Sequence, residues 1–197
     1  MTRTPASPHV IAVAGPKGAG RSTTAPRLLR DALEVTEFVN ADAIASGLSA
    51  FRPESVAMAA GRLMRGRMRQ LAEQGVSFAF ETTLASRSLA PWLAGLKERG
   101  YRIHLLFLRL ESADLAVSRV AERVRMGGHH VPEEDVRRRF DRGLRNLFAL
   151  YMPLADTWRL FDNSGRMGPR LVAMGEGRSV RLTADPDVWQ RVKEACA

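Results

Sequence analysis

Residues 15–22 combine glycines, cations and a hydroxyl at a spacing that could hold the phosphates of a nucleotide. The segment is GPKGAGRS, with Gly15 and Gly20 five positions apart and Ser22 two positions after the second glycine. This nearly matches the loop G-x-x-x-x-G-K-[ST], whose glycines turn backbone N–H groups toward phosphate oxygens. Arg21 stands where the motif has lysine. The spacing predicts that this loop binds a nucleoside triphosphate. Because arginine replaces the lysine of the motif, the sequence leaves open whether the protein turns that nucleotide over.

The loop carries two cations that could approach a phosphate. Arg21 keeps the positive charge, but its guanidinium is longer, planar and forked, so it grips phosphate without placing one point charge between the β- and γ-oxygens. Lys17, in the middle of the loop, is a candidate to supply that charge. Ser22 is the predicted Mg²⁺ ligand of the loop. The predicted nucleotide site consists of Gly15, Pro16, Lys17, Gly18, Ala19, Gly20, Arg21, Ser22 and Thr23.

Two carboxylates follow predicted strands and could act on a substrate. Asp42 suits a general base for an acceptor hydroxyl, but it equally suits the N-cap of a helix beginning at residue 43. Glu81 could hold Mg²⁺ through water or accept a hydrogen bond from a substrate hydroxyl. Thr82 and Thr83 could bind the substrate, or they could cap the end of the strand. The predicted substrate site consists of Asn40, Asp42, Glu81, Thr82 and Thr83, and the predicted metal ligands are Ser22 and Glu81.

Arginines between residues 119 and 142 flank a Gly127-Gly128 turn that joins two predicted helices. Such an arrangement suggests a lid whose cations stabilise the charge on a transferred phosphoryl group. Most of these arginines must face solvent, and only a few can touch ATP. The neighbouring His129 and His130 have no third ligand at a suitable spacing, which argues against a metal site there.

Apolar runs and helical patterns alternate along most of the chain. They predict strands over 9–14, 38–39, 76–80, 101–110 and 158–161, and helices over 21–34, 53–74, 88–99, 112–126 and from 132 onward. This alternation predicts right-handed βαβ units and a parallel sheet with helices on both faces. The ligands of such sheets bind beyond the carboxyl ends of the strands, where the loop, Asp42 and Glu81 all fall. His104, inside the fourth strand, is expected to be a core or half-buried residue and not a ligand.

Beyond Gly168 the pattern changes to short β-like runs. Residues 171–174 and 179–182 flank Gly175-Glu176-Gly177, which predicts a hairpin, and residues 186–195 suit a last helix. We expect one domain over residues 1–168, with a lid at about 119–142, and a C-terminal appendage of the same domain over 169–197.

The net charge and the aromatic content indicate which kinds of partner the protein can bind. The chain of 197 residues has a net charge of +9, and Lys17, Lys97 and Lys193 are its only lysines. An anionic partner fits this charge, but 7% aromatic residues leave little for base stacking, so a nucleic acid is not the expected ligand. No apolar run approaches the roughly 20 residues that span a bilayer, and the first residues lack the apolar stretch of a signal peptide. With Cys196 as the single cysteine, we expect a cytoplasmic protein without a membrane partner.

Together these pieces resemble the zeta toxin family of P-loop kinases, in particular its stand-alone bacterial branch. The matching segments are AGPKGAGRST (14–23), FVNADAIASGLS (38–49), FAFETTLASRS (78–88), GGHHVPEEDVRRRF (127–140) and FDNSG (161–165). The similarity covers roughly residues 9–173. The chain departs from the family at two positions, because that loop usually carries asparagine at position 17 and lysine at position 21.

The resemblance implies an α/β, three-layer P-loop kinase fold like that of shikimate kinase, with a five-stranded parallel sheet. It implies ATP or GTP with Mg²⁺, and phosphoryl transfer to a hydroxyl of a small acceptor such as UDP-N-acetylglucosamine. Asp42 would be the base, Glu81 would lie near Mg²⁺, and Thr83 would contact the acceptor. Arg21, Arg125 and Arg138 would act on the transferred group, with Arg123 and Arg139 on the nucleotide. A separate antitoxin protein could be a partner.

Two other functions stay open on the sequence. Arg21 at the lysine position is compatible with a nucleotide-binding protein of impaired catalysis. The net charge of +9 is compatible with a polynucleotide kinase or an RNA-binding protein, although the few aromatic residues make this the weaker alternative.

Overall fold

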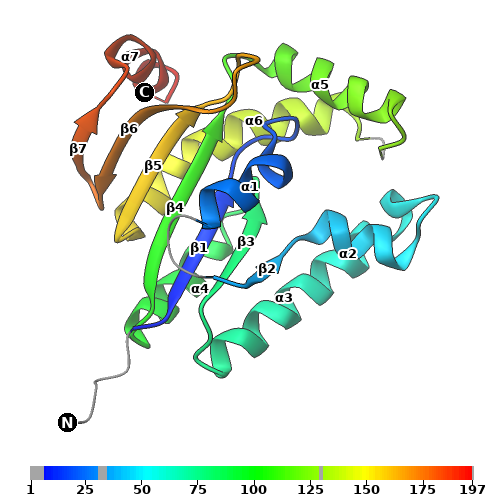
Figure 1. Cartoon of the computed structure of the whole chain (residues 1–197), viewed down its shortest axis with the longest axis horizontal. Coiled ribbons are helices and arrows are strands. Elements are labelled where there is room, and N and C mark those ends of the chain that lie inside the picture. Colours follow the sequence, from blue (N-terminus) through cyan, green and yellow to red (C-terminus); the bar gives the residue numbers. More distant parts are fainter. Residues whose placement is uncertain (1–6, 31–34, 129–130, 197) are drawn as a thin grey trace.

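The computed structural model describes residues 7–30, 35–128 and 131–196, which form one sheet with helices on both faces (Figure 1). The strand order is β2-β3-β1-β4-β5-β6-β7. The strands are β1 (His9–Ala14), β2 (Glu37–Val39), β3 (Phe78–Thr82), β4 (Arg102–Arg109), β5 (Thr157–Asp162), β6 (Arg170–Glu176) and β7 (Ser179–Thr183). Strands β1 to β5 run parallel, as predicted, and β6 and β7 run antiparallel.

The prediction of a five-stranded sheet is wrong in strand number. The predicted hairpin exists as β6 and β7, but β6 also pairs with β5 along its length, from Trp158 opposite Gly175 to Asp162 opposite Arg170. The sheet therefore has seven strands and is mixed. Sequence reasoning could not foresee this pairing, because a hairpin pattern does not say which free edge it will join.

Apart from α2 (Ala41–Leu48), for which no range was predicted, the helices begin and end close to the predicted residues. They are α1 (Arg21–Arg30), α2 (Ala41–Leu48), α3 (Ala57–Glu73), α4 (Leu89–Glu98), α5 (Ala113–Arg125), α6 (Glu133–Asn146) and α7 (Pro186–Glu194). Short 3₁₀ helices lie at Pro53–Val56 and Met152–Leu154, and a π-helical turn spans Leu147–Tyr151. Residues 31–34 of the first predicted helix, and the His129-His130 pair, lie outside the described residues. None of the described helices combines the length and apolar character needed to cross a bilayer.

Alternation along β1 builds the two layers of core. Val10, Ala12 and Ala14 face one side, where they pack in a cluster with residues of α3 and α4. Ile11 and Val13 face the other side, where they pack with residues of α1. Because both faces are covered, the strand is apolar throughout, as buried parallel strands are. This double burial fixes the end of β1, and hence the loop that follows it.

The C-terminal helix packs on the same core as the rest of the sheet. Trp189 of α7 stacks on Trp158 of β5, with ring centroids 5.8 Å apart, and Val188 and Val192 join the same cluster. Burial of large aromatic side chains contributes on the order of 2–3 kcal/mol each. Helix α7 is thus held against β5 and the neighbouring strand β6.

At the amino end of the sheet, polar side chains satisfy one another. Nδ1 of His9 lies 2.8 Å from Nε2 of His104, and Nδ1 of His104 lies 2.8 Å from Oγ1 of Thr157. Burial, reinforced by the charge of His9, lowers the pKa of His104 to about 4. Nearby, Asp156 accepts from the backbone N–H of Ile103 at 2.7 Å. His104 is half-buried and fully engaged, as the sequence predicted for a core residue.

Candidate active site

The loop between β1 and α1 lies against the backbone of a neighbouring strand. Gly15 has a φ of +145°, and a Cβ there would lie 2.3 Å from the carbonyl oxygen of Leu108 in β4. Both the backbone conformation and the close approach therefore require glycine. The N-terminus of α1 follows at Arg21, so backbone N–H groups and the positive end of a helix dipole gather at the carboxyl edge of the sheet. This is the geometry of an anion site.

The Arg21 side chain folds back against the base of this loop. Its Nη1 donates to the carbonyl oxygen of Gly15, and to those of Thr82 at 3.2 Å and Pro16 at 3.4 Å. Its Nε lies 3.4 Å from Oε2 of Glu81. The residue is only 8% exposed, and this burial lowers the pKa of Arg21 despite the opposing charge of Glu81. In this conformation the Nη1 and Nε donors of Arg21 are engaged by the protein itself.

Lys17 reaches across from the loop to α2 and pairs with Asp42. Its Nζ lies 2.7 Å from Oδ1 and 2.5 Å from Oδ2 of that carboxylate. The lysine is 7% exposed. Burial lowers the pKa of Lys17, Asp42 opposes that effect, and the charge of Arg21 adds to it. The structure therefore brings together the two residues that the sequence proposed as phosphate cation and general base.

The N-cap of α2 is Asn40, and the alternative that Asp42 caps this helix is wrong. The side-chain oxygen of Asn40 accepts from the backbone N–H groups of Asp42 at 2.7 Å and Ala43 at 3.3 Å. The Asn40 amide also donates to Oγ of Ser22 at 3.3 Å. Because Asn40 does the capping, the Asp42 carboxylate is directed to Lys17.

Two charged side chains near the loop carry buried polar atoms that find no hydrogen-bond partner among the described residues. The atoms are Nε and Nη2 of Arg123 and Oε1 of Glu81. Buried polar groups are normally paired, and an unpaired one costs about 1–3 kcal/mol. The charge of Arg123 also acts on Lys17 and Arg21, so the three cations lie close together. Unused donors beside a phosphate loop indicate an anion site, and an unused carboxylate oxygen there suits a cation.

Arg123 lines two clefts, which meet at this residue. The larger, of about 820 Å³, is lined by Gly18, Gly20, Thr23, Arg119, Arg123, Asn163 and Pro169, among others. The smaller, of about 500 Å³, is lined by Ser22, Asn40, Asp42, Ser46, Phe51, Glu54 and Arg123, among others. A group passed from one cleft to the other would move past Arg123 and the Lys17–Asp42 pair.

The segment after β5 forms a wall of the larger cleft and is tied to the loop. The amide of Asn163 donates to the carbonyl oxygen of Ala19 at 2.8 Å. Arg119 of α5 donates to the carbonyl oxygens of Asn163 at 2.7 Å and Ser164 at 2.8 Å. The wall and the phosphate loop are therefore one hydrogen-bonded unit.

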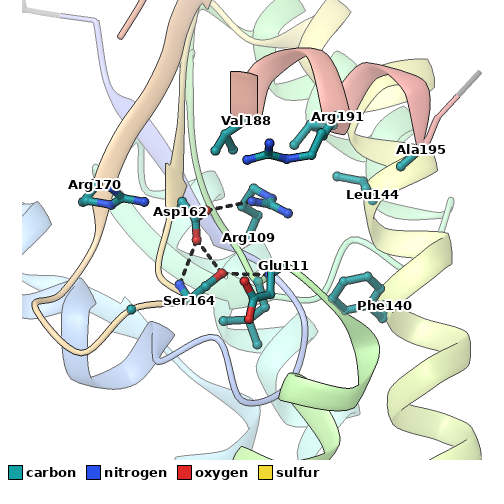
Figure 2. A pocket seen from close by; sticks show the side chains of 13 residues that line it. Arg109, Glu111, Phe140, Leu144, Asp162, Ser164, Arg170, Val188, Arg191 and Ala195 are labelled. Carbon is teal, nitrogen blue, oxygen red and sulfur yellow. Dashed lines mark hydrogen bonds and ion pairs between the residues drawn. The ribbon is translucent and has the colours of Figure 1, made fainter. Parts of the chain in front are cut away.

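Asp162, buried at the end of β5, positions this segment from behind (Figure 2). Its Oδ1 accepts from the backbone N–H of Ser164 at 2.8 Å and from the Ser164 hydroxyl at 2.5 Å, and its Oδ2 accepts from Arg109 at 2.7 Å. Burial alone would raise the pKa of Asp162, but the Ser164 hydrogen bonds and the Arg109 charge outweigh burial and lower it. Ser164 Oγ also accepts from the backbone N–H of Glu111 at 2.8 Å.

The structure brings only one of the four predicted lid arginines to the loop, which is Arg123. Arg138 pairs with Asp135 one turn earlier in α6, and Arg139 lies 3.5 Å from the same carboxylate. Arg125 is exposed at the end of α5. In this conformation Arg125, Arg138 and Arg139 line neither of the two clefts, and their roles stay predictions.

The two predicted substrate threonines use their hydroxyls locally. Thr82 Oγ1 accepts from the N–H of Leu84 at 3.0 Å, and Thr83 Oγ1 accepts from that of Ala85 at 3.4 Å. Helix α6 passes very close to this turn, because a Cβ on Gly143 would lie 2.4 Å from the carbonyl oxygen of Thr83. The capping alternative thus describes the threonines, whereas Glu81 keeps an unused oxygen.

Sequence reasoning missed Arg119, Asn163, Phe51 and Asp162 as residues that shape the clefts. The segment FDNSG was noted as a match to a family, without a structural role for its members. Its Asp-Asn-Ser order after an apolar strand is typical of a strand end that builds a turn, and could have flagged it. Phe51 gave no indication, because a single exposed aromatic residue has no pattern around it.

Comparisons with known proteins agree with this geometry. An uncharacterized protein of Haemophilus influenzae (strain ATCC 51907 / DSM 11121 / KW20 / Rd) is 28% identical over 126 residues, which is 64% of this chain and 88% of that protein. A chain of the AvrRxo1-ORF1:-ORF2 complex crystallised with ATP aligns with a TM-score of 0.73 at 18% identity. The alignment covers 98% of this chain and 65% of that one, so this chain spans slightly less than two thirds of that protein.

A second solved structure shares the fold. The PezAT chromosomal toxin-antitoxin system of Streptococcus pneumoniae aligns with a TM-score of 0.65 at 14% identity, over 97% of this chain and 80% of that one. A family model described as Zeta toxin matches residues 1–165. The match includes the phosphate loop, Asp42, Glu81 and Arg123, and it confirms the resemblance found in the sequence. With a P-loop kinase fold and a matched segment that spans most of its length, this chain belongs to the zeta toxin family.

Proposed function

We propose that this protein is a kinase that transfers the γ-phosphoryl group of ATP to a hydroxyl of a small acceptor. One observation carries the proposal: a phosphate loop, the Arg123 side chain with its buried and unused Nε and Nη2 donors, and the Asp42 carboxylate converge where two clefts meet. Membership of the zeta toxin family supports it. The family resemblance favours UDP-N-acetylglucosamine or a similar sugar nucleotide as the acceptor.

The larger cleft suits the nucleotide. Its volume of about 820 Å³ is within the range of small-molecule sites. Gly18, Gly20 and Thr23 at one end belong to the phosphate loop and the start of α1, where triphosphate groups bind. Arg119 and the tied segment after β5 form a wall of the cleft beside the loop, against which the base and ribose can lie.

The smaller cleft suits the acceptor. It holds the predicted base Asp42 together with Asn40, Ser46 and Glu54, which offer hydrogen bonds to hydroxyl groups. Phe51 is 99% exposed and gives the cleft an apolar face against which a sugar or base ring can pack. A ringed, hydroxyl-rich acceptor fits this combination.

The residues present fit a Mg²⁺ ion bound with the nucleotide. Oε1 of Glu81 is a buried carboxylate oxygen without a partner among the described residues, and Ser22 adds a hydroxyl at the start of α1. Mg²⁺ binds through one or two protein oxygens together with the phosphates of its nucleotide, and when bound it neutralises charge on those phosphates.

The transfer can be written with this chain's own groups. The acceptor oxygen forms a bond to the γ-phosphorus, and the bond between that phosphorus and the β–γ bridging oxygen breaks, which releases ADP with the electron pair. The acceptor proton passes to the Asp42 carboxylate. Arg123 and Lys17 stabilise the charge on the moving phosphoryl group, because phosphoryl transfer depends mainly on positioning and electrostatic stabilisation.

A protein partner is a further part of the proposal. The PezAT system is described as a toxin-antitoxin system, and AvrRxo1-ORF1 was crystallised as a complex with AvrRxo1-ORF2. Both structural neighbours therefore come from two-component assemblies. We propose by analogy that a separate antitoxin protein binds this chain.

A nucleotide-binding protein without turnover is the second candidate, because Arg21 is directed into the protein instead of the cleft. Incubation with ATP, Mg²⁺ and UDP-N-acetylglucosamine, followed by mass spectrometry of the products, separates the two. A phosphorylated sugar nucleotide supports the kinase, and a panel of other hydroxylated metabolites, with GTP in parallel, extends the search. If the protein binds ATP but consumes none with any member of the panel, the result supports a nucleotide-binding protein without turnover.

Asp42→Asn provides the matching loss-of-function test. Because a general base contributes about 10²–10⁴-fold, the variant should lose at least about 100-fold in turnover. Far-UV circular dichroism checks that the variant stays folded. Turnover close to that of the wild type would remove Asp42 from the role of base.

A further inference from the structure

The two cations of the phosphate loop differ in what they can offer a ligand. Arg21 Nη1 is used by three backbone carbonyls, including that of Gly15, and its Nε faces Glu81. Several of its donors are thus already committed to the wall and floor of the loop. A guanidinium is rigid, so it cannot turn toward a phosphate without giving up these bonds together.

Lys17 is placed differently. Its Nζ lies between the loop and α2, within 2.7 Å of both Asp42 oxygens, and among the described residues it donates no hydrogen bond to the loop backbone. An ammonium is a compact charge whose donors rotate freely on a flexible stem. A small movement of this stem can exchange one anionic partner for another without any change in the loop.

We propose that Lys17 and Arg21 have divided a task that one lysine performs in the usual loop. Arg21 braces the loop from within, and Lys17 is the cation that binds the transferred phosphoryl group. Before nucleotide binds, Lys17 holds Asp42 and keeps both carboxylate oxygens from an acceptor hydroxyl. The proposal rests on the proposed kinase function and deepens it, because it makes nucleotide binding the event that releases the base.

The charges around the pair favour such an exchange. Lys17 shares its surroundings with Arg21 and Arg123, and one carboxylate faces it. A polyphosphate brings several negative charges into this cation cluster and competes with Asp42 for Lys17. As Lys17 moves to phosphate, Asp42 becomes available to the acceptor. An ordered reaction follows, in which the nucleotide binds before the acceptor.

Competition between Asp42 and phosphate for Lys17 can be measured by binding alone. ATP with Mg²⁺ is titrated by calorimetry into the wild type, Asp42→Asn, Lys17→Gln and the double variant. We expect Asp42→Asn to bind ATP about tenfold more tightly and Lys17→Gln about tenfold more weakly. In the Lys17→Gln background, Asp42→Asn should give no gain. Asp42→Ala replaces Asp42→Asn if the latter fails to fold.

Glu54→Gln is the matched control, because Glu54 lines the same cleft, whereas the hydrogen bonds of Lys17 go to Asp42. Its effect on ATP affinity should stay below about twofold. An equal gain from Asp42→Asn in both backgrounds would mean simple charge repulsion, and it would overturn the exchange. No gain in either background would overturn it as well.

The division of labour is tested by the same substitution at both positions. Glutamine keeps a donor but removes the charge. Lys17→Gln should lower ATP turnover by at least about 100-fold, whereas Arg21→Gln should lower thermal stability and leave turnover within about tenfold. The opposite order would make Arg21 the transfer cation and refute the proposal. A wild-type protein that binds no ATP contradicts the kinase, while one that binds ATP without the Lys17–Asp42 coupling contradicts this inference alone.

Discussion

The two ends of the sheet differ in whether their buried polar groups have hydrogen-bond partners within the protein. At the amino end, His9, His104 and Thr157 satisfy one another within the protein. At the carboxyl end, Arg123 and Glu81 hold the only buried side-chain polar atoms that lack a partner among the described residues. One end is therefore complete as folded, and the other is complete only with a ligand. Unpaired buried charge, more than cleft size, marks the functional end.

Of the substitutions considered, removal of Arg123 should have the largest effect on the difference between the two ends of the sheet. In Arg123→Met we expect ATP affinity to fall about 10–100-fold, because charge-assisted hydrogen bonds contribute about 1.5–3 kcal/mol. The ligand-free variant should melt about 2–4 °C higher, since an unpaired buried guanidinium is lost. Calorimetry and thermal unfolding measure the two effects.

Arg178→Met is the matched control for that experiment. Arg178 is exposed in the turn between β6 and β7, and its removal changes the net charge equally. Both ATP affinity and melting temperature should stay near the wild-type values. A ligand-free Arg123→Met that melts lower than the wild type would contradict the comparison of the two ends.

A smaller effect is expected where the wall of the nucleotide cleft joins the loop. Asn163→Ala removes the hydrogen bond to Ala19 and should raise the KM for ATP about 3–10-fold, with little change in kcat. Asn146→Ala removes a similar bond, to the carbonyl oxygen of Leu84, outside both clefts. Steady-state kinetics should give a higher KM for ATP in Asn163→Ala than in Asn146→Ala. Equal KM values would show that the hydrogen bond between Asn163 and Ala19 does not contribute to nucleotide binding.

The amino end should respond to pH and not to nucleotide. The pKa of His104 is about 4 in the folded protein and near 6.5 when unfolded, so the unfolded chain binds more protons between these values. Acidification from pH 7 to pH 4.5 should therefore destabilise the wild type through His104 by about 1–2 kcal/mol, allowing for its partial exposure.

His104→Gln removes this dependence and serves as the comparison. Urea unfolding at both pH values should show a smaller loss of stability in the variant, while ATP affinity at neutral pH stays unchanged. The same pH slope in both proteins would show that His104 does not carry it.

Much of this architecture could be predicted from local pattern. The strand ends that carry the loop, Asp42 and Glu81 follow from apolar runs, because consecutive parallel strands bring their carboxyl ends to one edge. What could not be predicted depends on side-chain direction. The sequence offered both Arg21 and Lys17 as cations for a phosphate, and only the fold shows that Arg21 donates to backbone carbonyls and Lys17 to Asp42.

The lid illustrates the same limit. The spacing of arginines in α5 and α6 is helical, and several of them could have faced the loop. Arg123 does so because Gly128 leaves room beside it, whereas Arg138 meets Asp135 on its own helix. Similarly, capping of α2 by Asn40 instead of Asp42 depends on a shift of two residues, which lies within the uncertainty of any helix start predicted from sequence.

The contact between α6 and the turn after β3 has a consequence for how this protein can vary. A methyl group on Gly143 would collide with a backbone oxygen, whereas Gly66, on the outside of α3, has open space around it. A library randomised at both codons and selected for folding should return glycine almost exclusively at 143 and a broad range of side chains at 66. Side chains can therefore vary on the exposed face of α3 at position 66, and glycine is required where α6 crosses Thr83.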